Sequence, residues 1–161
     1  MTKSGKTILI VVLSTIGLCV VVCGGGAGLL FYLGYQASQS PENITVTVDH
    51  PVSVKKGETF IVEVHIDNTD SADQKLVGID IYEDYLDGFI LTSTNPGFNE
   101  SSNAFGIRSL IYDHTIPANG RLTIQIELQA VNDGMWAGDL DVMVNGILSF
   151  TTYYIQTQVD P

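Results

Sequence analysis

Residues 60–67 read FIVEVHID, and residues 122–129 read LTIQIELQ. In both stretches every second side chain is apolar, and most of the side chains between them are polar. Successive side chains of a β-strand point to opposite faces, so this period of two predicts two strands that each bury one face. A sheet with one apolar face must cover that face with another layer. The two stretches therefore predict an all-β domain with two packed sheets.

Working outward, shorter stretches of the same character surround these two strands. Turn signals such as Asp87-Gly88, Asn95-Pro96-Gly97, Pro117-Ala118-Asn119-Gly120 and the two-residue hairpin signal Asn145-Gly146 separate them. Further strands are expected at residues 44–48 with a continuation at 52–54, and at 76–83, 89–94, 107–112, 140–144 and 148–159. Residues 98–103 are expected to be a loop, and no segment after the N-terminal run has a helical period. This pattern predicts an immunoglobulin-like two-sheet sandwich of seven or eight strands.

Residues 8–33 form a run of 26 residues without a charged side chain. A hydrocarbon core ~30 Å thick needs about 20 apolar residues in a helix, so the run predicts one transmembrane α-helix. The only basic residues near it, Lys3 and Lys6, precede it, which places the N-terminus in the cytoplasm. We expect a cytoplasmic tail at 1–7, the membrane helix at 8–33, a linker at 34–42 and an extracytoplasmic domain at 43–161.

The same run has two competing interpretations. A cleavable signal peptide would use the small residues Gly25-Gly26-Ala27, but the apolar residues 29–33 continue beyond that point and favour an uncleaved anchor. A lipoprotein signal is disfavoured because Leu18 and Val22, rather than small residues, precede the two cysteines.

Small residues within the run suggest a surface for association between helices. Cys19 and Cys23 share one helical face, and Gly24 and Gly28 form a G-x-x-x-G pattern on the adjacent face. Such residues allow close packing, so a homodimer through the membrane helix is one hypothesis. A glycine-rich helix that has this spacing by chance is the other.

Charge and cysteine content narrow the class of protein. All 18 acidic residues, but only five of the seven basic ones, follow the apolar run. An acidic surface of this kind repels nucleic acid, so no nucleic-acid partner is expected. No cysteine follows Cys23, and the domain must therefore fold without a disulfide, which fits a prokaryotic cell envelope.

Two segments carry a resemblance to a known family. Residues 54–69, with a Gly-Glu turn, an alternating strand and an Asn-Thr loop, resemble immunoglobulin-like conserved-repeat and adhesion-related (CARDB-like) domains of bacterial and archaeal surface proteins. Residues 116–130 are similar to the second half of such domains. The resemblance implies an extracytoplasmic module for adhesion, spacing or protein contact. This chain has a single copy on its own anchor, which leaves adhesion and a role in a membrane-bound assembly both open.

An acidic loop is the candidate for a metal site. Asp67, Asp70 and Asp73 follow the first alternating strand, and Asp133 and Asp139 lie in a later loop region that the sandwich would have to bring to the same end. Ca²⁺ prefers six to eight oxygen ligands, which clustered loop carboxylates can supply. Loop aspartates also commonly cap turns and remain solvated. A calcium- or carbohydrate-binding module is therefore the alternative function.

No residue set in the sequence proposes a reaction. The motifs G-x-S-x-G and H-E-x-x-H and a phosphate-binding glycine loop are missing, so we expect neither an enzyme nor a catalytic residue. Trp136 is expected to anchor a corner of the core. One of Tyr153 and Tyr154 should face solvent, because neighbours in a strand point opposite ways. The expected function is protein contact or adhesion, through residues 150–159 or the loops far from the membrane.

Overall fold

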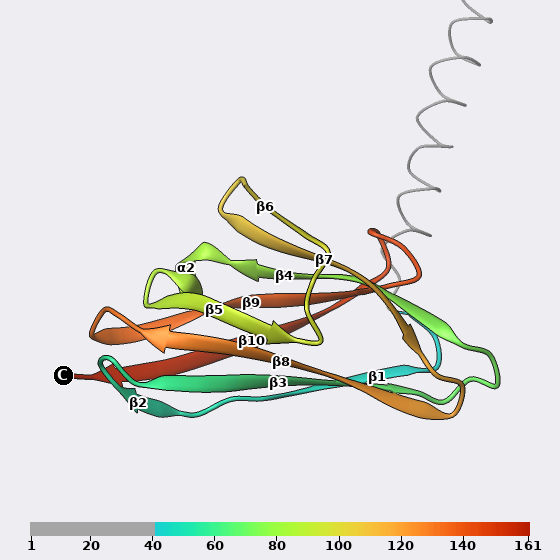
Figure 1. Ribbon diagram of the computed structural model, residues 1–161, viewed down its shortest axis with the longest axis horizontal. Helices are drawn as coiled ribbons and strands as arrows, with labels where there is room; N and C mark the ends of the chain where they lie inside the picture. The colour runs from blue at the N-terminus through green and yellow to red at the C-terminus, as the bar shows by residue number, and fades with distance from the viewer. Residues whose placement is uncertain (1–40) are drawn as a thin grey trace, which may run out of the picture. The chain divides into compact units, whose positions relative to one another are not determined.

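The computed structural model describes residues 41–161, which form ten strands and one short helix in two facing sheets (Figure 1). The expectations for residues 1–40, namely the membrane helix, Cys19, Cys23, Gly24, Gly28 and most of the linker, lie outside the described residues. Within residues 41–161, the structure has no helix whose length and apolarity would let it cross a membrane. The predicted two-sheet β-sandwich is confirmed, with more strands than expected.

The two alternating stretches lie side by side at the centre of a four-stranded antiparallel sheet. The strand order is β1 (Ile44–Asp49), β3 (Thr59–Asn68), β8 (Gly120–Ala130) and β5 (Phe89–Asn95). Ten residue pairs join β3 to β8, from Thr59 opposite Gln129 to Asn68 opposite Gly120 (Figure 1). Residues 60–67 and 122–129 therefore face each other along their whole length, with their apolar sides in register.

The second sheet has six strands and covers the apolar side of the first. Its order is β2 (Ser53–Lys55), β10 (Phe150–Asp160), β9 (Gly134–Val144), β4 (Gln74–Tyr82), β7 (Ile107–Ile116) and β6 (Glu100–Ala104). Only β2 and β10 are parallel; the other neighbours are antiparallel. The segment at 52–54 does not simply continue the first strand, because its residues leave β1 and join this second sheet as β2.

The core is apolar and lies between the sheets. Val64 and Ile124 of the first sheet, and Ile79, Leu110 and Val142 of the second, are completely buried. Each side chain of this size contributes about 1.5–3 kcal/mol when it is fully buried. Because cysteine is missing from residues 41–161, this burial, together with the backbone ladders, must hold the domain together.

An aromatic cluster closes one end of the core. Tyr85, which lies in helix α2 (Glu83–Leu86), is fully buried with its ring centroid 4.8 Å from that of Phe89, and Phe89 packs edge-on against Phe60. The hydroxyls of Tyr85 and Thr157 share a hydrogen bond of 3.0 Å. Burial raises the pKa of Tyr85 to about 12. The sequence did not indicate helix α2, because a single turn of four residues is too short to show a helical period.

The alternation in residues 76–83 predicts that Val77, Ile79 and Ile81 share the buried face of β4, and this prediction is partly wrong. Ile79 and Ile81 are buried as predicted, but Val77 is only half-buried and Leu76 is completely buried. A β-bulge between Leu76 and Gly78 is the reason, since it shifts the pairing with both β7 and β9. A bulge changes which side chains face the core, whereas the alternation of apolar and polar residues in the sequence stays the same.

Trp136 anchors a corner, as predicted. Its indole N–H donates a hydrogen bond of 2.9 Å to the carbonyl of Asn132, and its ring is packed against the core. The ring lies directly over Gly88, where a built Cβ would approach its carbons to 2.3 Å. Only a residue without a side chain fits beneath the indole.

Like charges meet on the outer face of the six-stranded sheet. Asp80 of β4 is directly opposite Asp141 of β9, and Asp139 precedes Asp141 by two residues in β9. Partial burial, followed by the charges of Asp80 and Asp139, raises the pKa of Asp141, although a hydrogen bond from the Thr152 hydroxyl opposes this rise. The ionised form of Asp141 is therefore disfavoured in the folded protein.

Replacing Gly88 with Ala should destabilise the domain by about 1–3 kcal/mol, because the added methyl group must displace the Trp136 ring. Urea unfolding of the full-length protein, followed by far-ultraviolet circular dichroism, measures the loss. Gly97→Ala is the matched control, since a Cβ there meets no atom within 4 Å. Equal unfolding midpoints for the two variants would show that the Trp136 contact does not constrain position 88.

Replacing Asp141 with Asn should stabilise the protein at pH 7 by about 0.5 kcal/mol, because it relieves repulsion on a partly solvated face. The folded-state pKa is raised, so the ionised carboxylate costs stability above that pKa and the cost disappears as pH falls through it. The gain should thus shrink towards pH 4. Thermal melting at the two pH values tests this, with exposed Asp84→Asn as control; a gain independent of pH would contradict it.

Candidate functional site

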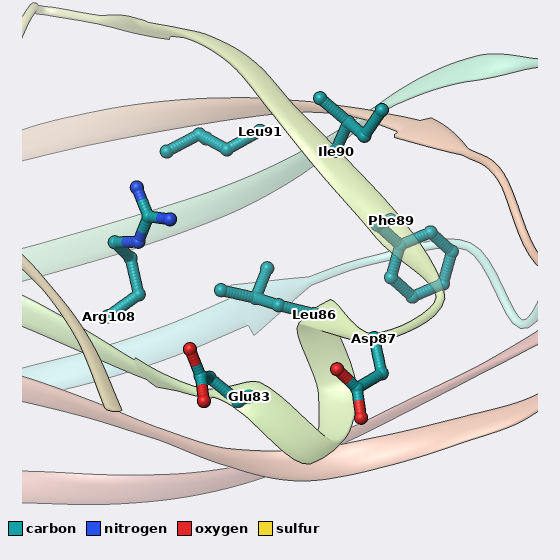
Figure 2. Close-up of a pocket in the computed structure, with 7 residues that line it drawn as sticks. All are labelled: Glu83, Leu86, Asp87, Phe89, Ile90, Leu91 and Arg108. Atoms are coloured by element: carbon teal, nitrogen blue, oxygen red, sulfur yellow. The ribbon is translucent and has the colours of Figure 1, made fainter. Parts of the chain in front are cut away.

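A pocket of about 270 Å³ opens at one end of the sandwich (Figure 2). Helix α2 and the residues after it supply the carboxylates of Glu83 and Asp87, and β7 supplies Arg108. The apolar part of its lining consists of Leu86, Phe89, Ile90 and Leu91. An apolar recess with a few charged groups at its rim is the usual character of a binding pocket.

Arg108 is the most unusual residue of this pocket. Figure 2 shows its guanidinium group between the side chains of Leu91 and Glu83. Its Nε is buried and has no hydrogen-bond partner in the part of the chain that the structure describes. A buried donor without a partner costs free energy, so a bound acceptor at this position would be favourable. By contrast, ion pairs engage the side chains of Lys56, Lys75 and Arg121.

The β6–β7 hairpin stands next to the pocket. Its two-residue turn consists of Phe105 and Gly106, with φ angles of 55° and 76°. The backbone N–H of Glu83 donates to the carbonyl of Gly106 at 2.9 Å, and the Asn103 side chain donates to the Glu83 carboxylate. These contacts fix the hairpin to α2, and therefore to the pocket.

Phe105 is fully exposed at the tip of this hairpin. Positive φ at both central positions is typical of a type I′ turn, which strongly favours Asn or Asp before Gly. Phenylalanine is an unfavourable choice for the left-handed region, and its exposed ring gains no burial among residues 41–161. Phe105 therefore has an unfavourable backbone conformation, and no contact among the described residues compensates for it.

The acidic loop is held by contacts within the protein. Asp67 receives two hydrogen bonds from Arg121, at 2.7 and 2.8 Å, and these lower the pKa of Asp67. Asp70 accepts from the backbone N–H of Ala72 at 3.2 Å, and Asp73 from that of Ala118 at 2.8 Å. Donors of the protein itself therefore engage a carboxylate oxygen of each of the three aspartates.

The structure does not bring the second acidic group to this loop. Asp133 follows the end of β8 and forms an ion pair of 3.0 Å with Lys56, whereas Asp67 pairs with Arg121 at the beginning of β8. The two groups therefore lie at opposite ends of an eleven-residue strand. Among residues 41–161 no three His, Cys, Asp or Glu side chains are placed to hold a metal ion together. Calcium binding by Asp67, Asp70 and Asp73 stays a prediction.

The last strand has the expected alternation. Tyr154 is exposed, while Tyr153 packs against the core and its hydroxyl donates to the carbonyl of Val46, so one tyrosine of the pair faces solvent as predicted. The acidic residues between positions 80 and 87 predict an exposed acidic face. Asp84 and Asp87 are exposed, but Asp80 and Glu83 are half-buried.

Sequence reasoning missed the hairpin and the pocket. All five residues of β6 are exposed, so the strand has no buried face and no apolar alternation that could reveal it. The dipeptide Phe105-Gly106 in front of an apolar stretch was the one local signal for a hairpin. No local sequence pattern indicated that Arg108 lines a pocket, because its position beside α2 follows from strand pairing alone.

No protein-family model matches the chain, and no curated protein matches its sequence. In structure, it is similar to AvmM, which catalyses macrocyclization in alchivemycin A biosynthesis, with 10% identity, TM-score 0.49 and coverage of 76% of this chain and 91% of that one. It is also similar to the cupredoxin domain of amoB from Nitrosocaldus yellowstonii, with 9% identity, TM-score 0.48 and coverage of 76% and 90%.

A further similar structure is Escherichia coli α-2-macroglobulin activated by porcine elastase, with 17% identity and TM-score 0.45 over 74% of this chain and 9% of that protein. These proteins differ in function, and at such scores and identities their activities say nothing about this chain. What holds for residues 41–161 is the two-sheet β-sandwich itself, which is coarser than the CARDB-like resemblance found in the sequence.

Proposed function

We propose that this chain is a single-pass envelope protein that presents its β-sandwich outside the cytoplasm, where the Phe105 hairpin and the neighbouring pocket contact another protein. The membrane part of the proposal rests on the charge-free run at 8–33 and on Lys3 and Lys6 before it. The contact part rests on one observation, which is the fully exposed phenylalanine in an unfavourable backbone conformation. The proposed role is non-catalytic.

The hairpin has the features of a contact site in a protein interface. Aromatic residues are enriched among the few interface residues that dominate binding energy. Beside Phe105, the pocket offers apolar walls and the unpaired Nε of Arg108 to an acceptor of the partner. β6 also has one unpaired edge, because its only neighbour in the sheet is β7. An aromatic anchor next to an apolar recess with a polar rim is a common arrangement at such interfaces.

The location of the hairpin also suits contact away from the membrane. The chain enters the domain just before β1, whose first residue Ile44 pairs with Asn68 at the end of β3. β4 begins near that end and runs the length of the sheet to Tyr82, which pairs with Ile107 beside the hairpin turn. Phe105 therefore lies at the end of the domain far from the point where the chain enters it.

Replacing Phe105 with Asn should remove the proposed contact with the partner protein without destabilising the domain. Asn suits the left-handed conformation, so this variant should be equally stable or more stable by up to about 1 kcal/mol in urea unfolding. A photo-crosslinking amino acid at exposed Ser102 in intact cells should give a discrete adduct that Phe105→Asn abolishes. A crosslinker at exposed Tyr154 serves as a control for the final strand. An adduct at Tyr154 that survives Phe105→Asn would move the interface to β10.

The topology is tested with protease added to intact cells or spheroplasts. The domain should be digested from outside while a short membrane-bound fragment near the N-terminus survives, because the lysines hold that end inside. A cytoplasmic protein assayed in parallel must stay intact as a control for lysis. Protection of the domain would refute the proposed orientation, and a soluble chain that begins near Gly28 would show a cleaved signal peptide instead.

A further inference from the structure

The loop between β9 and β10 exposes an apolar surface. Ile147 and Leu148 in this loop are 68% and 57% exposed, and Phe150 at the start of β10 is 37% exposed. Residues 145–150 contain no charged side chain. Single exposed apolar residues are normal, but a cluster on an uncharged loop is typical of a surface that contacts a protein or a membrane.

Hydrogen bonds connect this loop to the point where the chain enters the domain. Asp70 accepts from the side chains of Asn43 and Gln74, each at 3.4 Å, and Gln74 accepts in turn from the side chain of Asn145. At the base of the loop, the backbone N–H of Asn145 donates to the carbonyl of Lys75 at 2.8 Å, and its side chain accepts from the Lys75 N–H at 2.9 Å. The apolar loop and Asn43 are therefore at the same end of the sandwich.

The length of chain before the domain limits how far this end can be from the apolar run. Seven residues, 34–40, separate the run at 8–33 from the first described residue, Pro41. Even a fully extended chain covers only ~3.3–3.6 Å per residue, so the eight steps from Leu33 to Pro41 give an upper limit of about 29 Å. If the run spans a bilayer, the loop end of the domain is confined to the neighbourhood of that bilayer.

We infer that Ile147, Leu148 and Phe150 insert into the interfacial region of the bilayer that holds residues 8–33. The inference rests on the proposed membrane anchor and adds a second membrane contact. Apolar side chains without neighbouring charges suit the boundary between headgroups and acyl chains. The carboxylates of Glu42, Asp70 and Asp73 at the same end disfavour an anionic surface, so the lipid that fits this face is zwitterionic.

The inserted loop would set the orientation of the domain. One covalent connection leaves the domain free to rotate about it, whereas a connection and an inserted loop at separate points restrict that rotation. Asn145 holds the base of the loop with φ at 61° and two hydrogen bonds to Lys75 of β4, one from its backbone N–H and one to its side-chain oxygen. In this orientation the Phe105 hairpin, at the opposite end of β4, would be directed away from the lipid.

The experiment uses the full-length protein with Cys19 and Cys23 replaced by Ser, reconstituted into phosphatidylcholine vesicles. Leu148→Cys carries an environment-sensitive fluorophore, and some of the lipids carry a nitroxide quencher near the headgroup. Phe105→Cys, which is also exposed but lies at the far end, is the matched control. Quenching at position 148 should exceed quenching at position 105 several-fold. Flotation of the vesicles first establishes whether the protein is membrane-bound.

The outcomes separate the inference from the proposed anchor. Failure to float would refute the anchor, and the inference with it. A protein that floats but is quenched equally at the two positions would overturn the inference while the anchor stands. A third outcome is a fluorophore at position 148 that is shielded from water and transfers energy between two copies of the protein, but is not quenched by lipid. This result would assign the loop to a dimer contact and would also overturn the inference.

A second set of variants tests the apolar side chains themselves. A fluorophore on Gly146→Cys, where an added Cβ meets no atom within 4 Å, reports on the loop without disturbing it. The double change Ile147→Ser and Leu148→Ser removes exposed apolar groups only, so circular dichroism should be unchanged. Lipid quenching at position 146 should fall to the level of the Phe105→Cys control. Undiminished quenching would show that the apolar side chains do not hold the loop in the lipid.

Discussion

The whole domain depends on covering the apolar face that β3 and β8 create together. Their ten-residue ladder places the buried side chains of residues 60–67 and 122–129 on one side of the four-stranded sheet. In water that surface would be unstable, and it becomes stable only when β4, β7 and β9 of the other sheet lie against it. No disulfide is available to share this task, because both cysteines lie at or before position 23.

Closure of the sandwich gives the domain two ends with different chemistry. At the end where the chain enters, polar side chains from Asn43, Asp70, Gln74 and Asn145 form a connected network beneath an apolar loop. At the other end, α2, β5 and β7 enclose a pocket with an unpaired arginine nitrogen, and a rigid hairpin displays a phenylalanine.

The features that sequence reasoning missed have a common physical cause. Alternation of apolar and polar residues reports burial of one face, so β6, which buries neither face, was read as a loop. The bulge in β4 exchanged Val77 for Leu76 in the core, because one inserted residue moves the following side chains to the opposite face. In the acidic loop, Asp67, Asp70 and Asp73 were recognised as a group, but the donors that occupy their oxygens come from distant segments and leave no local pattern.

By itself, the sequence determined the all-β class, most strands, the acidic surface, the corner role of Trp136 and the charge-free run at 8–33, because all of these depend on residue type and local spacing. Only the tertiary structure decided which strands are neighbours, that β2 belongs to the second sheet, and that Phe105 and Arg108 lie at one end while Ile147 and Leu148 lie at the other. The reason is that pairing between strands joins residues far apart in the chain, such as Ser53 of β2 and Gln158 of β10, and local spacing contains no information on such partners.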